Sequence, residues 1–405
     1  MTVATIGGAF FLGFVWLLAL GWLWQLWQWL SNFPSLVDLT QIPHESLPAL
    51  PVDSGDTPQL TVIVPACNEE VSIEATLRSL LASEEIRLQI LAVDDRSTDR
   101  TGEIMEQVAA EASTVSIRHT LQVLHIRELP SGWLGKPHAL ATAAQSAQSE
   151  WILCTDADVL FAPRAASLAL GYALAVQADH LILMPDWTMK SHGEAAMHGA
   201  LHALSTWTLR LWRVADPAAR DSLGVGAFNL IRRSAYEALG GFAALRMEVL
   251  EDLRFGRMLK RSGYRQRVVL GPGLAAVRWS RGAWGVVRNL EKNLFALYRY
   301  NIVLTLFACL GLAVQITLPL AAIIAGGTTR LAGIVTYTAI AGLYVASRKV
   351  TRVPPVYVLV YPLAASLFLF AMLRSMILVL VRGGVIWRGT LYSLKDLRAN
   401  TGRFW

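Results

Sequence analysis

The chain has 405 residues, of which 54% are hydrophobic and 16% are charged, and its formal net charge is +6. This length is enough for a large core, and the apolar content is unusual for a soluble protein. Many basic residues lie in the last third and no basic stripe with interleaved aromatics is seen, so we expect contact with anionic lipid headgroups and no nucleic-acid partner.

The first predicted element is a membrane anchor. No Asp, Glu, Lys or Arg precedes Asp38, and Ala9–Leu30 is long enough to cross a bilayer, which takes about 20 apolar residues. A signal peptide is the weaker interpretation, because the N-terminus has no basic segment and no clear cleavage site. We expect an anchor over residues 1–30 and a linker over residues 31–58. An interfacial aromatic belt is predicted from Trp22, Trp24, Trp27 and Trp29.

Between residues 59 and 300, short apolar runs alternate with amphipathic stretches. Strands are expected at Leu60–Val64, Leu88–Val93, Leu121–His125, Trp151–Thr155 and His180–Met184. Helices are expected at Val71–Ala82, Asp99–Ala112, Pro137–Ala147 and Pro163–Ala175. This alternation is typical of βαβ units, so the sequence predicts an α/β domain with a mostly parallel sheet.

About three membrane helices are predicted over residues 301–381. Asn301–Ala325 and Leu331–Ser347 carry no charge, and Pro355–Val381 contains only Arg374. A central arginine costs about 3 kcal/mol on insertion scales, which the aliphatic and aromatic residues of that segment offset. Residues 382–405 form the predicted basic tail.

The positive-inside rule leaves the side of this tail open. The basic loop Ser347–Val353, the middle domain and the tail should all be cytoplasmic. A single last crossing would place the tail on the other side. Either the last apolar segment is a hairpin broken near Pro362, or the tail breaks the rule. We expect an integral protein of the inner membrane with a cytoplasmic middle domain.

The cysteines and one histidine pair show no convincing metal spacing. Cys67, Cys154 and Cys309 lie in apolar runs and are expected to be core residues of a reduced compartment. His198 and His202 are four residues apart, but no third ligand lies in the same motif, so a zinc site is not expected.

Acidic residues follow two of the predicted strands. Asp94 and Asp95 come after Leu88–Val93, and Asp156 and Asp158 come after Trp151–Thr155. Ligands bind at the carboxyl ends of strands in open α/β sheets, and residues two apart in an extended segment point the same way. Asp156 and Asp158 can therefore hold Mg²⁺ or Mn²⁺ together with substrate phosphates.

These acids also have ordinary structural interpretations. Asp94 and Asp95 could shape a turn, Asp156 and Asp158 could be loop acids before a helix, and Glu251-Asp252 could be charges at a helix N-terminus. Neither a GxGxxG fingerprint nor a GxxxxGK[ST] loop occurs, which argues against dinucleotide oxidoreductases and P-loop enzymes.

Four segments, in order, resemble the family 2 glycosyltransferases, which have the GT-A fold. Val62–Glu70 is similar to the family's opening strand and nucleotide-contacting loop, and Val93–Asp99 is similar to its second signature. Thr155–Asp158 is similar to its DxD metal motif and Glu251-Asp252 to its ED motif. The resemblance covers about Gln59 to Asn301.

The resemblance implies roles for these residues. Asp252 would be the catalytic base, with Glu251 and Arg278 also in the catalytic set. Asp156 and Asp158 would bind Mg²⁺ or Mn²⁺. The implied reaction is an inverting transfer from a nucleotide sugar, expected to be a UDP-sugar, to a hydroxyl of a membrane lipid. The nucleotide sugar would be contacted by Pro65, Ala66, Asn68, Glu69, Asp94, Asp95, Lys136 and Asp156.

Smaller features refine the resemblance. Gly132–Lys136 is similar to a segment of ceramide-, hopanoid- and carotenoid-type membrane glycosyltransferases, although a plain turn is the alternative. Gly240–Phe242 resembles the family's GGF near the acceptor site, with a helix C-cap as the alternative. The (Q/R)xxRW motif of processive members is incomplete, because Ala275 stands at its first position ahead of Arg278.

Other assignments stay open at this level. Glu248 is the alternative base, one helical turn from Asp252. Gly193–Val214 and Arg281–Tyr300 could lie on the bilayer surface or be ordinary core helices. A processive polysaccharide synthase, a GT-A-like nucleotidyltransferase and a catalytically inactive membrane scaffold are the rival functions.

Overall fold

The computed structural model describes residues 3–50, 57–115 and 118–400, which form two compact units. The helical unit combines the chain up to Ser35 with Met189–Arg210 and Trp279–Val385. The sheet unit combines Leu36–Thr188 and Leu211–Arg278 with the chain from Ile386 onward. Both units are thus assembled from separate stretches of sequence, whereas we predicted one contiguous middle domain over residues 59–300.

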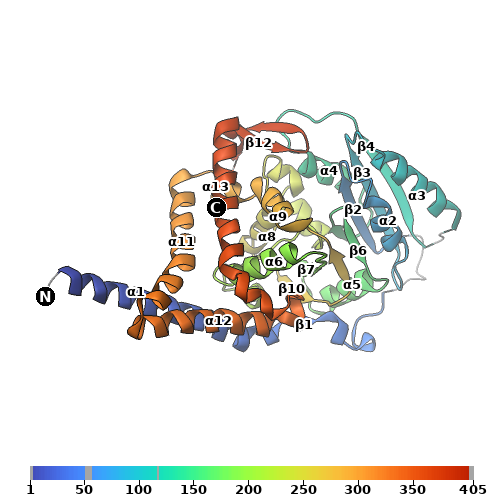
Figure 1. Ribbon diagram of the computed structural model, residues 1–405. Coiled ribbons are helices and arrows are strands. Elements are labelled where there is room, and N and C mark those ends of the chain that lie inside the picture. The colour runs from blue at the N-terminus through green and yellow to red at the C-terminus, as the bar shows by residue number, and fades with distance from the viewer. Residues whose placement is uncertain (1–2, 51–56, 116–117, 401–405) are drawn as a thin grey trace. The chain divides into compact units, whose positions relative to one another are not determined.

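The sheet unit is built on an eight-stranded sheet with the order β1-β10-β7-β9-β5-β2-β3-β4 (Figure 1). Every neighbouring pair is parallel except those of β9, which runs antiparallel to β5 and β7. The predicted α/β domain with its mostly parallel sheet is confirmed. The strands are β1 (Val37–Asp38), β2 (Leu60–Ala66), β3 (Leu88–Asp95), β4 (Thr120–Ile126), β5 (Trp151–Cys154), β7 (His180–Leu183), β9 (Asn229–Arg232) and β10 (Gln266–Leu270).

Helices cover both faces of this sheet, so the side chains of its central strands are buried on both sides. In β2, Leu60, Val62 and Val64 join one hydrophobic cluster and Ile63 joins another, as alternation along a strand requires. The first cluster includes residues of α2 (Ile73–Leu81), α3 (Thr101–Val115) and α5 (Ala165–Ala175). The second includes residues of α4 (Gly135–Ala144), α7 (Arg233–Ala238) and α8 (Glu251–Arg261).

Two smaller sheets complete the sheet unit. One has the order β6-β11-β8, with β6 at Val159–Phe161, β8 at Asp186–Trp187 and β11 at Ala275–Val277. The other is the hairpin of β12 (Gly384–Trp387) and β13 (Thr390–Ser393), which is followed by α14 (Leu394–Asn400). Single-turn 3-10 helices are η1 (Phe33–Ser35), η2 (Leu39–Gln41), η3 (His44–Ser46), η4 (Leu211–Arg213) and η5 (Gly241–Leu245).

The two segments that were expected to be linker and tail contribute to the sheet unit. Within residues 31–58, Val37–Asp38 forms the edge strand β1, paired with β10. Within residues 382–405, the hairpin and α14 are ordered elements rather than a plain basic extension. Residues 51–56 of the predicted linker, and residues 401–405 with Arg403, lie outside the described residues.

The helical unit contains four helices that are long and apolar enough to cross a membrane: Gly8–Ser35, Ile302–Ala325, Gly327–Thr351 and Pro355–Arg382. Of the two alternatives left open for the last apolar segment, the structure excludes the hairpin broken near Pro362. Pro362 lies in the first turn of α13, where a backbone N–H has no helical partner, so the helix continues unbroken to Arg382. The elements of the helical unit are α1 (Val3–Asn32), α6 (His192–Ser205), α9 (Gly282–Glu291), α10 (Leu294–Leu297), α11 (Ile302–Ala325), α12 (Gly327–Thr351), η6 (Pro355–Val360) and α13 (Tyr361–Arg382).

The structure contradicts the predicted aromatic belt for two of its four members. Trp24 and Trp27 are exposed, at 54% and 52%. Trp22 instead lies edge-on to Trp207 and is buried, and Trp29 is buried with its ring edge-on to His202. Two of the four indoles therefore stabilise the interior of the helical unit and cannot face lipid.

Histidines and charges in the helical unit have structural partners. His198 lies edge-on to Trp279, and no group of three His, Cys, Asp or Glu side chains suited to a metal occurs within residues 3–50, 57–115 and 118–400. Arg374, the one charge inside the last span, pairs with Glu291 at 3.0 Å. The arginine in the span is therefore neutralised by a carboxylate at the end of a neighbouring helix.

Candidate active site

The loops that follow β2 and β3 are joined by hydrogen bonds. The side-chain oxygen of Asn68 accepts a hydrogen bond from the Thr98 backbone N–H at 2.8 Å. The Asn68 N–H donates to Ser97 Oγ at 3.1 Å, and the Glu69 N–H donates to Thr101 Oγ1 at 2.7 Å. Both predicted nucleotide-contacting segments therefore form one surface at the carboxyl end of the sheet. Pro65 and Ala66, the last residues of β2, are buried beneath it.

Asp95 is held in place by its neighbour in sequence. Arg96 donates two hydrogen bonds to the Asp95 carboxylate, at 2.8 Å and 3.2 Å, and Asp95 is only 1% exposed. Gly135, the first residue of α4, approaches so closely that a Cβ there would lie 2.3 Å from Asp95 Oδ2. A glycine is required at this position because any side chain would displace the carboxylate.

Asp94 supports the loop from behind. Its Oδ1 accepts a hydrogen bond from the Ser97 N–H at 3.2 Å, and its Oδ2 lies 2.9 Å from His125 Nδ1. Hydrogen bonds from His125 to Glu106 and to Asp94 raise the pKa of that imidazole. These two contacts connect Asp94 with the loop after β3 and with His125 of β4.

Lys136 is the centre of a partly buried charge cluster. Its Nζ lies 2.6 Å from Asp156 Oδ1 and 2.8 Å from Glu251 Oε1, which joins the DxD and ED motifs. Burial opposes the charged amine, but Asp156, Glu251 and Asp252 outweigh it and hold the pKa of Lys136 well above its ordinary value. The lysine is therefore a fixed positive charge between the predicted metal-binding and catalytic carboxylates.

Asp252 accepts two backbone hydrogen bonds, from the Gly226 N–H to Oδ2 at 2.8 Å and from the Leu253 N–H to Oδ1 at 2.7 Å. Burial, and then the nearby Glu251 carboxylate, raises the pKa of Asp252 to about 6. A carboxylate with this pKa is ionised at neutral pH and is a better proton acceptor than an ordinary aspartate. The geometry therefore suits a general base.

Gly226 brings the two halves of the cluster together. A Cβ at this position would lie 2.7 Å from Asp156 Oδ2 and 3.0 Å from Lys136 Nζ. The cavity lined by Lys136, Thr155, Gly226, Glu251 and Asp252 has a volume of only about 10 Å³. The backbone must pass this close for Gly226 to donate to Asp252, so an alanine here would push the cluster apart.

Asp158 and Asp156 fit a divalent cation. Burial, and then the charges of Asp156 and Glu69, raises the pKa of Asp158 to about 7. Crowded carboxylates of this kind are stabilised by a cation. Magnesium is usually held by one or two carboxylates together with substrate phosphates, so a pair of acids, rather than a complete protein cage, is what such a site requires.

Strand pairing brings Arg278 towards the DxD motif. In the antiparallel pair of β11 and β6, Val277 lies opposite Val159. Continuing that register by one residue places the backbone of Arg278 opposite Asp158. The incomplete (Q/R)xxRW motif therefore still delivers its arginine to the neighbourhood of the predicted metal site.

Glu248 is not one helical turn from Asp252, as we predicted, because α8 begins only at Glu251. Its carboxylate lies 3.1 Å from Arg254 Nε, and the side chains are 8% and 4% exposed. Burial raises the pKa of Glu248, while Arg254 lowers it. This acid is committed to a buried ion pair, so the geometry favours Asp252 as the base.

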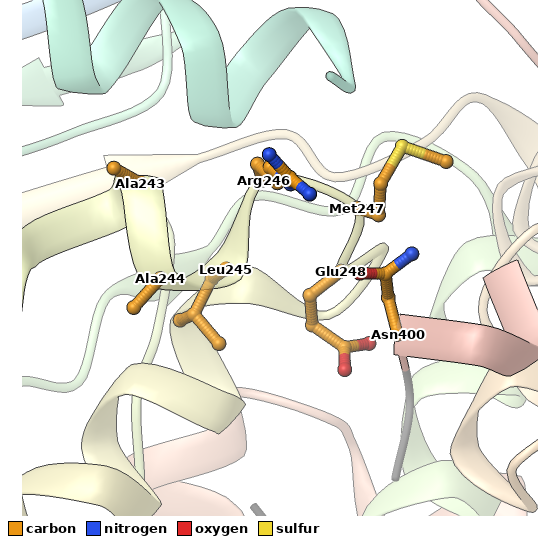
Figure 2. A pocket seen from close by; sticks show the side chains of 7 residues that line it. All are labelled: Ala243, Ala244, Leu245, Arg246, Met247, Glu248 and Asn400. Carbon is orange, nitrogen blue, oxygen red and sulfur yellow. The ribbon is translucent and has the colours of Figure 1, made fainter. Parts of the chain in front are cut away.

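A larger cavity of about 290 Å³ lies beside this ion pair. It is lined by the segment between the GGF and ED motifs and by Asn400 of α14 (Figure 2). Figure 2 labels Glu248 and Asn400 among the side chains that line the cavity. Most of its lining residues directly follow Gly240–Phe242, the segment that the resemblance places near the acceptor. Its lining is Ala243, Ala244, Leu245, Arg246, Met247, Glu248 and Asn400.

Several residues of this region were missed from the sequence. Gly226 belongs to a Gly-x-Gly loop, but its importance depends on Asp156 and Lys136 being close by. Arg96 was passed over because its partner is its own neighbour. The third, Arg388, lies far along the chain and pairs with Glu69 at 3.3 Å. Of these three residues, only Gly226 had a local sequence signal, because a Gly-x-Gly loop indicates a close approach of the backbone to a neighbouring element.

Comparison with known proteins agrees with these motifs. Residues 61–253 match the family model described as Glycosyl transferase family 2. The 4,4'-diaponeurosporenoate glycosyltransferase of Staphylococcus haemolyticus (strain JCSC1435) is 24% identical over 217 residues, covering 51% of this chain and 53% of that protein. That of Staphylococcus aureus (strain USA300) is 24% identical over 199 residues, covering 49% and 50%. The chain spans about half the length of the curated relatives it matches.

Two solved structures are also similar. Mannosyltransferase PcManGT from Pyrobaculum calidifontis, in complex with GDP-Man and Mn²⁺, has a TM-score of 0.49 and 22% identity, covering 88% of this chain and 95% of that one. S. aureus TarS 1-349, in complex with UDP-GlcNAc, has a TM-score of 0.38 and 15% identity, covering 82% and 95%.

Proposed function

We propose that this chain, whose residues 61–253 match the model of Glycosyl transferase family 2, transfers a sugar from a nucleotide sugar to a hydroxyl of a membrane lipid. The observation that carries the proposal is the partly buried cluster of Asp156, Lys136, Glu251 and Asp252. Three carboxylates around one lysine are costly in a protein interior unless substrate binding or catalysis uses them. A membrane scaffold without activity would have no need of this arrangement.

In the proposed reaction Asp252 takes the proton of the acceptor hydroxyl while that oxygen attacks the anomeric carbon. The bond from the anomeric carbon to the diphosphate breaks, and the nucleoside diphosphate leaves with the bonding electron pair. Attack from the face opposite the leaving group inverts the anomeric centre. Asp252 is placed for this by its two backbone hydrogen bonds, which leave the carboxylate fixed before substrate binds.

Binding of the donor is assigned to the surface at the ends of β2 and β3. Asp95, held by Arg96, would hold the nucleotide base, and Asn68 would shape the adjoining loop. Lys136 and Arg278 would lie against the diphosphate, where they stabilise the negative charge that develops on departure. Bound at Asp158 and Asp156, Mg²⁺ or Mn²⁺ would neutralise further charge on the same leaving group.

A lipid acceptor is supported by two features. Four helices are long and apolar enough to cross a membrane, and the curated relatives are named as 4,4'-diaponeurosporenoate glycosyltransferases. The incomplete (Q/R)xxRW motif, with Ala275 at its first position, disfavours a processive polysaccharide synthase. We propose a UDP-sugar as the donor, and UDP-sugars are therefore the first class to test.

Donor turnover tests this function. The purified chain in lipid with Mn²⁺ or Mg²⁺ is given a panel of UDP- and GDP-sugars, and release of nucleoside diphosphate is followed. We expect release from one donor to rise at least tenfold when a membrane lipid extract is added, because the acceptor hydroxyl replaces water as nucleophile. Absence of both release and metal-dependent donor binding would contradict the function and favour the scaffold.

We further propose that the sheet unit and the C-terminal tail lie on the cytoplasmic side of the inner membrane. The hairpin and α14 belong to the sheet unit, so the chain must return to the same side between Trp279 and Val385. An even number of crossings is then required, although three long apolar helices lie in that interval. At least one of α11, α12 and α13 therefore does not cross the bilayer completely.

This topology can be tested by labelling in intact cells and in inverted vesicles. A single cysteine replaces exposed Lys395 in α14, or exposed Glu237 in α7, and a membrane-impermeant maleimide is applied. We expect both positions to react only from the cytoplasmic side, because both lie on the sheet unit. Reaction of the two positions from opposite sides would show three crossings and overturn the assignment.

A further inference from the structure

The C-terminal hairpin lies outside the matched family region, and from Ile386 onward it belongs to the sheet unit. Its two strands are joined by Arg388 and Gly389, which have φ angles of +50° and +79°. Two successive residues with positive φ form the type I′ turn that suits a tight hairpin. A glycine accepts this conformation freely, whereas an arginine does not, so the turn holds Arg388 at the tip at some conformational cost.

The tip of the hairpin contacts the loop after β2. Arg388 Nη2 lies 3.3 Å from Glu69 Oε1, and the side chains are 27% and 31% exposed. Arg388 also donates a side-chain hydrogen bond to Cys67 and works against the burial that raises the pKa of that thiol. The charge of Glu69 in turn acts on Asp158. The guanidinium is therefore separated from the predicted metal site by a single carboxylate.

The second strand of the hairpin contacts the loop after β3. Tyr392 is 8% exposed and shares a side-chain hydrogen bond with Arg96. Arg96 is the residue that fixes the Asp95 carboxylate by two hydrogen bonds. One short hairpin thus reaches both segments that were predicted to bind the nucleotide, with a cation at its tip and an aromatic hydroxyl on its second strand.

We propose that the hairpin Gly384–Ser393 is part of the donor site and that the guanidinium of Arg388 binds the diphosphate of the nucleotide sugar. This inference rests on the proposed glycosyltransferase function. A guanidinium is always charged and matches phosphate oxygens with two parallel hydrogen bonds. The guanidinium of Arg388 is partly exposed. When it binds phosphate oxygens in place of the Glu69 carboxylate, that carboxylate becomes free next to Asp158.

Lys136, which the proposed function also places against the diphosphate, has more carboxylate partners than Arg388. Lys136 is already shared between Asp156 and Glu251 and is 14% exposed. Arg388 has one carboxylate partner at 3.3 Å and remains partly open to solvent. Tyr392 has the separate role of a positioning residue, because it acts on Asp95 through Arg96.

The test separates contact with the diphosphate from support of the loops. Affinities of the full chain in lipid nanodiscs are measured with Mn²⁺ for UDP and GDP, and for uridine and guanosine. The variants are Arg388→Ala, Arg388→Lys and Tyr392→Phe. Lys395→Ala is the matched control, because it removes one positive charge from the same C-terminal segment at an exposed position.

We expect Arg388→Ala to weaken binding of the nucleoside diphosphate about 10- to 100-fold, as loss of a charged hydrogen-bonding group predicts. Binding of the matching nucleoside should change less than about twofold. Arg388→Lys should retain part of the affinity, since it keeps the charge but not the fork. Tyr392→Phe should weaken nucleoside and nucleoside diphosphate equally, and Lys395→Ala should match the wild type.

Two results would overturn the inference while leaving the enzyme intact. One is unchanged diphosphate affinity in Arg388→Ala. The other is an equal loss for nucleoside and nucleoside diphosphate in that variant, which would make the hairpin a support of the loops only. If the wild-type chain binds no nucleoside diphosphate at all, the proposed function itself fails, which is a different outcome.

Discussion

Asp252→Asn lowers kcat for sugar transfer about 10³- to 10⁴-fold while the donor still binds, as expected for loss of a general base. The amide cannot accept the proton of the acceptor hydroxyl. It also cannot accept both backbone hydrogen bonds, from Gly226 and Leu253, that the carboxylate now receives. Thermal unfolding is measured alongside turnover, because an unsatisfied backbone N–H costs about 1–3 kcal/mol of stability.

The pH profile provides the control for this assignment. The pKa of Asp252 is raised to about 6, so the residue keeps its proton below that pH and is ionised above it. The rate should therefore fall about tenfold per pH unit below pH 6 and level off above it. The residual activity of Asp252→Asn should lack this limb. Full activity in the variant would return the role of base to Glu248, despite its ion pair with Arg254.

Asp158→Asn lowers turnover about 10³-fold and removes the metal dependence of donor binding, since metal stabilisation of a leaving group contributes several kcal/mol. Asp158 is partly buried, and the charges of Asp156 and Glu69 act on it and contribute to its raised pKa. Replacing one carboxylate by an amide relieves the repulsion between these charges, so the variant should be at least as stable as the wild type while it binds donor poorly.

Titration calorimetry with a nucleoside diphosphate, with Mn²⁺ and with EDTA, measures this effect directly. Glu237→Gln is the matched control, because it also removes one carboxylate from the sheet unit, and its side chain is 64% exposed. EDTA should weaken binding to the wild type and to this control but leave Asp158→Asn unchanged. Metal-dependent binding that persists in Asp158→Asn would remove this residue from the metal site.

The α/β class and the predicted strands could be derived from the sequence because their signals are local. A buried strand such as Leu88–Asp95 is a continuous apolar run that ends in acids, and the membrane helices are long stretches with almost no charge. The DxD and ED acids were found in the same way, as motifs at strand and helix ends. The roles assigned to these residues remain predictions.

Other features depended on contacts between segments that lie far apart. Lys136 meets both Asp156 and Glu251 only because α4 and α8 pack on the same face of the sheet. Trp22 and Trp29 do not belong to the predicted belt because they pack against Trp207 and His202, which lie in another segment of the chain. Periodicity states that a side chain is apolar or polar, but it does not state which partner will be there.

By itself, the sequence determined that this protein combines an α/β domain with membrane-type helices, because hydrophobic periodicity encodes both, and its short motifs resemble those of family 2 glycosyltransferases. Only the tertiary structure decided that Gly226 closes the charge cluster and that Arg388 reaches Glu69 across 319 residues of sequence. The physical reason is that such contacts depend on strand order and on the return of the chain to the sheet unit. Neither is written in any local stretch of residues.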